Sequence, residues 1–421
     1  TQTHHAGRIL RVQEKRERIL TDSTILHWND LTADCLQRLL GRISSPPDSD
    51  RVAEYLLALG RTPAAVRLLA RTERKVGPGY HGFDFNTSAE VTLEEDLLRR
   101  DLTINAMALD SDGTLIDPHG GLRDLKDRLL RHVSDAFGED PLRILRVARF
   151  AARFQEFDFK VAPQTMELMH GMVTSGEANE LKPDRVWQET GKALAERNPE
   201  VYFEVLRGCG ALKVVFPEID ALFGVPQPAK WHPEIDTGVH TLMALQIAAG
   251  LTESVAVRFA VLTHDLGKAE TPKEILPKHR GHEERSVKIL ASFCSRLPVP
   301  RRYRELAVAV ARHHGSVHRT HELRPSAVGR LIEAVDAVRR PERFEEFLLA
   351  CEADARGRAG LENQPYPQAN SLRAALNAAR NVQIEDLQGT AKGTELGEQL
   401  KERRIQAIRE VLLKISADRR P

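Results

Sequence analysis

The chain of 421 residues is poor in cysteine and in aromatic side chains. Its four cysteines lie far apart without any CxxC pair, which argues against a disulfide framework or a cysteine-rich zinc site and favours a reducing compartment. Aromatic residues make up 5% of the chain, which disfavours a single-strand binder built on stacking platforms. No apolar run approaches membrane-spanning length and no signal peptide is visible, so we expect a cytoplasmic protein without a membrane partner.

An excess of charge of one sign is also lacking, because the net charge is only +1. A polyanionic partner must therefore be met by local patches. The clearest patch is a helix predicted over residues 141–154, preceded by Asp140 as a good N-cap and opened by Pro141. At about 100° per residue its arginines fall within roughly one third of the circumference; they are Arg143, Arg146, Arg149 and Arg153. Such a stripe is either a solvated basic face or a set of bidentate donors to phosphates or base edges, and the motifs elsewhere favour the second reading.

The sequence predicts a mixed α and β part followed by a long helical part. Residues 1–69 hold scattered helical patches but no convincing central strand. Further on we expect a short acidic helix over 93–98 and a strand over 114–116. From Leu122 nearly everything indicates helix, over 122–132, 141–154, 163–172, 183–195, 199–207, 239–250, 255–264, 282–296, 301–313, 326–337, 341–355, 371–379 and 394–416.

Several short motifs follow one another in a fixed order from Arg71 onward. They are Arg71-Thr72-Glu73-Arg74-Lys75, RRDLTINA over 99–106, Ile116-Asp117-Pro118, GLRDL over 121–125, Glu139-Asp140 with Arg143, and AKWHPEID over 229–236. As a set they resemble the bacterial CCA-adding enzymes, the class II tRNA nucleotidyltransferases, from about Arg71 to Lys414. The resemblance implies an α+β nucleotidyltransferase-like head, incomplete or altered at its N-terminus, followed by a long all-α body that includes an HD domain.

The resemblance also implies an activity and its partners. Such enzymes add C, C and A to the tRNA 3′ end from CTP and ATP without a nucleic-acid template, and Mg²⁺ supports the transfer. It implies that Arg100, Arg146 and Arg149 bind the nucleotide and that Asp140 and Arg143 read the base edge. A homodimer is left open. The expected domains are the unmatched segment 1–69, the head 70–131, a nucleotide- and RNA-binding body 132–225, the HD domain 226–340 and a tail 341–421.

The head lacks two elements that the family normally has, a Gly-Gly-x-Val-Arg-Asp loop and an Asp-x-Asp pair for the catalytic Mg²⁺ ions. The only Asp-x-Asp of the region, Asp48 and Asp50, lies about twenty residues too close to Arg71 by the family's usual spacing. We interpret it as a chance match, with a displaced metal pair as the alternative. Two hypotheses account for residues 1–69: a wrong-frame reading of a normal gene, or a genuine loss of the polymerase site. Either one predicts little or no CCA addition by this chain.

A second constellation resembles the HD phosphohydrolase signature. The adjacent pair His264-Asp265, together with His240 and a later Asp354, provides imidazoles and carboxylates for Ni²⁺ or another divalent metal. We predict His282 and His314 as further ligands or substrate contacts. The resemblance implies hydrolysis of 2′,3′-cyclic phosphates, 2′-phosphates of nucleotides and some phosphomonoesters. Where the family sometimes has His-Asp, this chain has His314-Gly315, so that one carboxylate is absent.

The C-terminal helix carries a basic group that the resemblance places against tRNA, namely Lys401, Arg403 and Arg404. Sequence-independent phosphate contact is the role we expect, and an ordinary amphipathic helix is the alternative. For the whole chain two alternatives to a bifunctional enzyme remain: an HD phosphohydrolase with a vestigial head, or a non-catalytic tRNA-binding protein.

Overall fold

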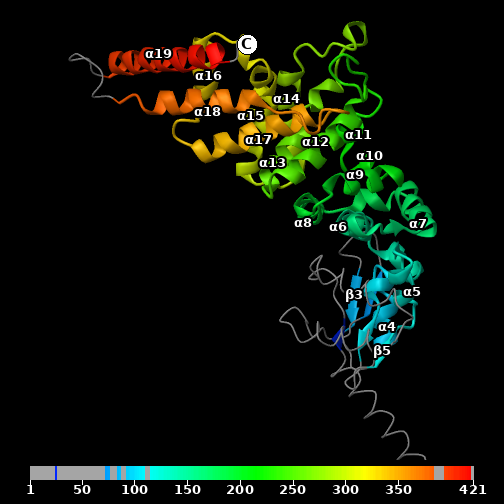
Figure 1. Ribbon diagram of the computed structural model, residues 1–421. Coiled ribbons are helices and arrows are strands. Elements are labelled where there is room, and N and C mark those ends of the chain that lie inside the picture. The colour runs from blue at the N-terminus through cyan, green and yellow to red at the C-terminus, as the bar shows by residue number, and fades with distance from the viewer. Residues whose placement is uncertain are drawn as a thin grey trace, which may run out of the picture. The chain divides into compact units, whose positions relative to one another are not determined.

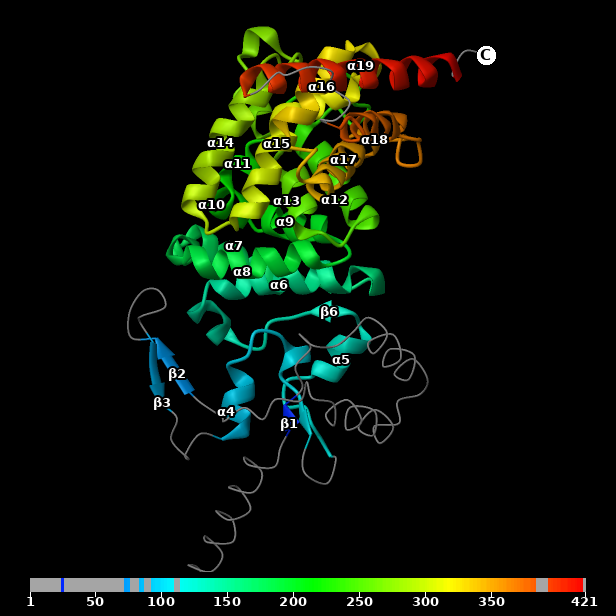
Figure 2. The same ribbon diagram turned by 90° about the vertical axis from the view of Figure 1, so that its left-hand side faces the viewer.

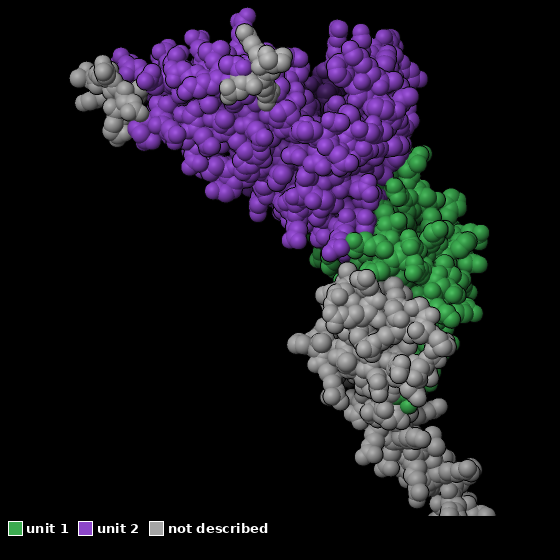
Figure 3. Space-filling view, in the orientation of Figure 1, with its two compact units in different colours: residues 1–193, 201–215 green, residues 194–200, 216–421 purple. Residues whose placement is uncertain are grey.

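The computed structural model describes residues 92–109, 114–383 and 393–418, together with three short strands nearer the N-terminus (Figure 1). The chain forms two compact units, one of residues 1–193 and 201–215 and the other of residues 194–200 and 216–421 (Figure 3). None of the described helices is both long enough and apolar enough to cross a membrane.

The first unit begins with small sheets. β1 (Thr24–Ile25), β4 (Ala108–Leu109) and β5 (Leu115–Ile116) form an antiparallel sheet in the order β1-β4-β5, and β2 (Thr72–Lys75) pairs with β3 (Phe83–Asn86). The helix predicted over 93–98 is confirmed as α4 (Leu93–Leu98). Thr92 and Glu95 form a capping box that satisfies free amides at its start. Its buried leucines pack with Ala106 and Ala108.

The helix predicted over 122–132 is wrong in its second half. α5 (Gly121–Lys126) ends early, and β6 (Leu129–Leu130) pairs in parallel with β7 (Lys160–Val161). Arg128, between them, adopts a left-handed φ of 58°, which a helix does not allow. Its carbonyl accepts from the amide of Lys160, so a partner more than thirty residues away replaces the helical hydrogen bond.

Helices complete the first unit. They are α6 (Leu142–Phe154), α7 (Pro163–Thr174), α8 (Pro183–Ala195, whose last two residues fall in the second unit), α9 (Pro199–Gly208, which starts there) and α10 (Ala211–Val215). The proline at the start of three of them suits the first helical turn, where the amide has no partner within the helix. An ion pair between Arg149 and Glu189 joins α6 to α8, and Arg185 of α8 pairs with Asp140, just before α6.

Helices joined by turns and loops form the described part of the second unit (Figure 2). Its α-helices are α11 (Pro217–Asp220), α12 (Thr237–Leu251), α13 (Val255–Thr263), α14 (His282–Arg296), α15 (Arg301–His318), α16 (Pro325–Ala334), α17 (Pro341–Arg356), α18 (Pro367–Arg380) and α19 (Thr394–Asp418). Every residue of α13 from Ala256 to Thr263 is buried, because α12, α15 and α17 pack around it. α19 packs against α16 and α18.

A close approach fixes the end of α17 against α12. A Cβ atom added to Gly357, just after α17, would lie 2.4 Å from the Cα atom of Ala244 on α12. Real Cβ atoms do not approach backbone so closely, so only glycine permits this packing. The predicted helices 183–195 and 282–296 are confirmed to the residue, whereas the one predicted over 301–313 continues to His318.

We predict that Gly357→Ala lowers stability, whereas the matched substitution Gly250→Ala on α12 does not. The first forces the two helices apart and costs about 1–3 kcal/mol, as overpacking does. The second meets no atom within 4 Å, and alanine favours a helix interior by about 0.5–1 kcal/mol. Thermal unfolding of both variants checks this. Equal midpoints for the two would contradict the close packing.

Candidate functional site

Two imidazoles and two carboxylates meet inside the second unit, and we call His240, His264, Asp265 and Asp354 the HD centre. His264 and Asp265 follow α13 directly, while His240 comes from α12 and Asp354 from α17. All four are at most 3% exposed. The structure thus brings together, from three helices, the four residues that the sequence singled out for this site.

Asp354 is the carboxylate that the imidazoles share. Its Oδ1 lies 3.0 Å from Nε2 of His240 and 3.4 Å from Nε2 of His264. The Oδ2 atom of Asp265 lies 3.1 Å from the same His264 nitrogen. Both carboxylates therefore face the inner nitrogens of the two histidines.

Two more histidines face the other oxygen of Asp265. Its Oδ1 lies 3.3 Å from Nε2 of His282, at the start of α14, and 3.6 Å from Nε2 of His314, on α15. These two imidazole nitrogens are 3.2 Å apart. The predicted positions His282 and His314 therefore lie at the HD centre, and the ring of His314 also contacts that of His264.

Each of the four histidines is oriented by a backbone carbonyl. A carbonyl oxygen only accepts, so each Nδ1 atom carries the proton and each Nε2 atom is directed inward as the ligand atom. The pairs are His240 with Gly357 O at 3.0 Å, His264 with Val261 O at 2.6 Å, His282 with His279 O at 2.8 Å and His314 with Val310 O at 3.0 Å.

The structure adds contacts that the sequence reasoning missed. His318 lies 2.7 Å from Oδ2 of Asp354, and its spacing of four residues from His314 on one helix was a usable signal. Glu234 places Oε1 3.1 Å from Nδ1 of His240 and 2.9 Å from Nδ1 of His232. Lys268, 7% exposed, pairs with Asp265 at 2.5 Å.

The charges of the HD centre support one another. Burial opposes the charged form of His264, but the Asp265 and Asp354 carboxylates outweigh it and raise its pKa to about 10. Burial also opposes the ionisation of both carboxylates, yet the neighbouring cations, His264 first, hold their pKa values well below the usual range. Burial lowers the pKa of His314 to about 3, so this imidazole is neutral at physiological pH.

The donor set fits a divalent cation. His264 Nε2 and both oxygens of Asp265 are buried without a partner in hydrogen-bond geometry, which is costly unless something else binds them. Imidazoles with carboxylates suit borderline metals such as Ni²⁺, Mn²⁺ or Zn²⁺, and a bound cation would replace the proton that the carboxylates hold on His264. The potential ligand atoms of His240, His264 and Asp265 lie within 4.8 Å of one another, as do those of His264, His314 and Asp354.

The arginine stripe of α6 is not a solvated face. Arg149 is 3% exposed and places Nε 2.6 Å from Oε2 of Glu189 on α8. Arg146 pairs with Asp101, to which its Nε donates at 2.6 Å. Arg143 donates to the carbonyls of Ala136 and Arg99, and each guanidinium is thus already bound to an acceptor of the same unit.

The predicted base-reading Asp140 has a partner that the sequence did not suggest. Arg185 of α8 donates to its Oδ2 at 2.8 Å, and its Oδ1 accepts from the amide of Leu142 at 3.0 Å. α6 begins at Leu142, one residue later than predicted.

Arg100, which was predicted to bind the nucleotide, pairs with Asp96 at 2.9 Å. Asp48 and Asp50 lie outside the described residues.

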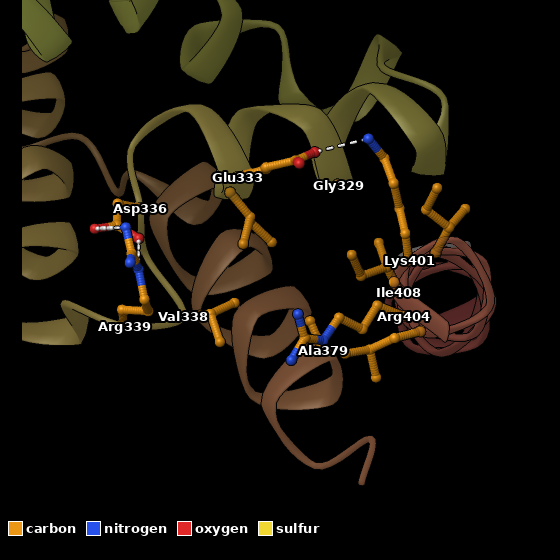
Figure 4. Close-up of a pocket in the computed structure, with 13 residues that line it drawn as sticks. Gly329, Glu333, Asp336, Val338, Arg339, Ala379, Lys401, Arg404 and Ile408 are labelled. Carbon is orange, nitrogen blue, oxygen red and sulfur yellow. Dashed lines mark hydrogen bonds and ion pairs between the residues drawn. The ribbon is translucent and has the colours of Figure 1, made fainter. Parts of the chain in front are cut away.

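The predicted tRNA-contact residues lie on α19, beside a cavity of about 480 Å³ between α16, α18 and α19 (Figure 4). Lys401 reaches Glu333 of α16 at 2.9 Å. Arg404 lines the cavity, and its Nε atom is buried without a hydrogen-bond partner. Arg403 is exposed. One of the three cations is therefore engaged within the unit and one is turned toward solvent.

Three protein families match parts of the chain. They are the poly A polymerase head domain over residues 67–131, the probable RNA- and SrmB-binding site of polymerase A over 158–223 and the HD domain over 237–342. The multifunctional CCA protein of Nitrosococcus oceani is 59% identical over 345 residues, which cover 82% of this chain and 84% of that protein. The chain belongs to the multifunctional CCA proteins. These are CCA-adding tRNA nucleotidyltransferases with an HD phosphohydrolase domain, as the motifs predicted.

Other relatives agree with this assignment. The multifunctional CCA protein of Thioalkalivibrio sulfidiphilus is 60% identical over 344 residues, again 82% of this chain and 84% of that protein. Among solved structures, the Thermotoga maritima CCA-adding enzyme complexed with tRNA has a TM-score of 0.54 at 19% identity, covering 98% of this chain and 95% of that one. A CCA-adding enzyme in an apo form has a TM-score of 0.56 at 20% identity, covering 83% and 76%. They share the fold, a nucleotidyltransferase head followed by a mostly helical body.

We predict that Asp101→Asn destabilises this CCA protein at neutral pH by about 2 kcal/mol, because it leaves the Arg146 guanidinium without its carboxylate partner. Burial opposes ionisation of Asp101, but Arg146 and the other donors hold its pKa well below the usual value. The carboxylate therefore stabilises the fold above about pH 4, and this contribution is lost as the pH falls toward the lowered pKa.

Unfolding of wild type and variant at pH 7 and pH 3 measures this difference, which should shrink at pH 3. Asp158→Asn is the matched control, because Asp158 forms an exposed ion pair with Arg128 and also adopts a left-handed φ, which asparagine tolerates. A destabilisation by Asp101→Asn that is the same at both pH values would contradict the role of the ionised pair.

Proposed function

We propose that the HD centre hydrolyses 2′,3′-cyclic phosphates, 2′-phosphates of nucleotides and some phosphomonoesters with a bound divalent cation, for which Ni²⁺ is our first candidate. One observation supports this most strongly: four imidazoles direct their Nε2 atoms at two buried carboxylates, each with its Nδ1 held by a carbonyl. A hydrolytic HD domain needs such a preorganised ligand set.

The residues of the HD centre have distinct roles in this proposal. His240, His264, Asp265 and Asp354 would hold the cation, and His282 and His314, close to Oδ1 of Asp265, would extend the ligand set. A bound divalent cation would acidify a water molecule and polarise a phosphoryl oxygen. Lys268 keeps Asp265 ionised, and His318 with Glu234 hold Asp354 and His240 in place. Because Nδ1 of His314 donates to Val310, its Nε2 stays free to accept a proton or bind a ligand.

For the head we infer weak nucleotidyl transfer by this chain. Residues 1–69 contain neither the Gly-Gly-x-Val-Arg-Asp loop nor a well-placed Asp-x-Asp pair, so the Mg²⁺ ions that assist attack on the α-phosphate lack their carboxylates. The solved relatives in complex with ATP and with CTP support nucleotide binding by this fold. In our proposal Arg100, Arg146 and Arg149 contact CTP or ATP, and Asp140 with Arg143 select the base.

The tail is proposed to contact the phosphates of tRNA. Arg403 is exposed on α19 and offers a guanidinium to a phosphate, while Arg404 and Lys401 would first have to leave the cavity wall or Glu333. Sequence-independent contact of this kind positions the RNA without reading it.

We predict that His264→Ala abolishes Ni²⁺-dependent hydrolysis of 2′,3′-cyclic AMP by the full chain. The variant removes the ligand atom that both carboxylates approach. His313→Ala is the matched control, because His313 neighbours His314 on α15 but its charged neighbours are Arg312 and Glu284. Turnover is followed by chromatography of the released nucleotide. Undiminished turnover in His264→Ala would contradict the assignment.

We also predict little or no incorporation of labelled CMP into tRNA that lacks its CCA end. The assay uses the full chain with Mg²⁺ and CTP, and a complete multifunctional CCA protein serves as the positive control. Hydrolysis at the HD centre, measured in the same preparation, shows that the protein is folded. Incorporation at a rate similar to the control would show that residues 1–69 supply the missing carboxylates after all.

A further inference from the structure

An open pocket of about 810 Å³ lies directly beside the HD centre. Its wall includes His318, which contacts Asp354 of the HD centre, and His232, which contacts Glu234 next to the centre. A volume of this size suits a nucleotide-sized ligand. The proposed hydrolysis assigns no role to the other side chains of this wall, of which Trp231 and Arg358 are unusual.

Arg358 is a cation without an anionic partner. Its Nε atom is buried without a hydrogen-bond partner, and no carboxylate of the described ranges pairs with it. Two other arginines of the wall are engaged: Arg356 binds Glu352 and the carbonyl of Glu362, and Arg319 binds the carbonyl of Gly315. Arg358 itself is only partly buried, and its buried Nε atom lacks the acceptor that such a group normally binds.

The backbone around Arg358 is tied to the HD centre on both sides. The preceding carbonyl, of Gly357, accepts from Nδ1 of His240, and the following amide, of Ala359, lies 3.4 Å from Oε2 of Glu234. Arg358 therefore lines the pocket together with His232 and Tyr366, on a backbone segment that contacts the HD centre.

Trp231 is a large apolar side chain left in contact with water. It is 59% exposed, although the adjacent His232 is only 9% exposed. The amides of both residues donate to the carbonyl of Pro228, so the turn itself is fixed. Lys230 places Nζ 4.8 Å from the centre of the indole ring. A fixed aromatic face with a nearby cation is the kind of surface on which a nucleobase stacks.

We propose that Trp231 and Arg358 form the nucleotide subsite of the HD centre, in which the indole stacks on the base and the guanidinium binds the phosphate that is hydrolysed. The inference rests on the proposed hydrolysis and deepens it by naming two residues that bind the nucleotide substrate. In the reaction water adds to phosphorus and one phosphorus–oxygen bond breaks. A cyclic diester then becomes a monoester with a free hydroxyl group.

The first test compares two substrates in the full chain with Ni²⁺: 2′,3′-cyclic AMP, and glycerol 2-phosphate, which has no base. Stacking predicts that Trp231→Ala raises KM for the nucleotide by roughly 10-fold, with kcat and the glycerol 2-phosphate KM unchanged, and that Trp231→Phe retains most of the affinity. Arg358→Gln should raise KM for both substrates by roughly 10-fold. Arg301→Gln removes the same charge from an exposed ion pair at the start of α15, and should change neither.

A second test needs no turnover. Added 2′-AMP should quench the tryptophan fluorescence of the metal-free full chain, and Trp231→Phe should remove that quenching, because the chain's other two tryptophans are unchanged. Wild-type hydrolysis with quenching that survives Trp231→Phe, or equal KM changes for both substrates in Trp231→Ala, would overturn the subsite. Quenching that depends on Trp231 in a chain that hydrolyses neither substrate with any divalent metal would instead overturn the hydrolysis and leave the subsite standing.

Discussion

The carboxylate of Asp354 is the interaction on which the catalytic part of this structure depends. From α17 it reaches His240 on α12, His264 after α13 and His318 on α15, so one buried side chain links four helices. Burying a carboxylate in this way is costly unless cations or donors surround it. Here they do, and the same carboxylate and imidazoles form the ligand set of a metal centre. The same atoms therefore hold the helices of the second unit together and position the metal ligands.

The two units differ in how far their charged side chains are paired. On α6 of the first unit the arginines are bound to Asp101, Glu189 or backbone carbonyls of the same unit. In the second unit Arg358 has no such partner, and four inward-facing imidazole nitrogens surround acids that ionise readily. The net charge of +1 does not reveal this difference between the units. It counts acidic and basic residues but does not say which of them form ion pairs. The unpartnered Nε atom of Arg358 marks the place where we propose that the phosphate of an HD substrate binds.

Much of this could be predicted from the sequence. Helix bounds were accurate where an apolar stripe of the right period lay between clear start and stop residues, as in α8 and α14. The HD centre followed from His264-Asp265, because adjacent ligands at a helix end form a local signal. Asp354 could be predicted as a ligand because the sequence around it resembles that of the family, although ninety residues separate it from His264.

Other features depend on partners that no local pattern announces. The arginines of α6 have the helical spacing that is typical of a solvent-exposed face. Only the structure, in which Glu189 of α8 pairs with Arg149, shows that Arg149 is buried. Residues 129–130 have a helical sequence pattern, yet they form the strand β6, which pairs with β7. Arg185 meets Asp140 from forty-five residues away. Pairings between distant segments, which pattern and propensity do not encode, account for these differences.

Anomalous diffraction at the nickel absorption edge, from crystals of the full chain grown with Ni²⁺, tests the central claim most directly. The account predicts a nickel peak within the HD centre, in contact with Nε2 of His240 and of His264 and with the carboxylates of Asp265 and Asp354. A well-ordered centre without a peak, or nickel bound only elsewhere on the chain, would contradict it.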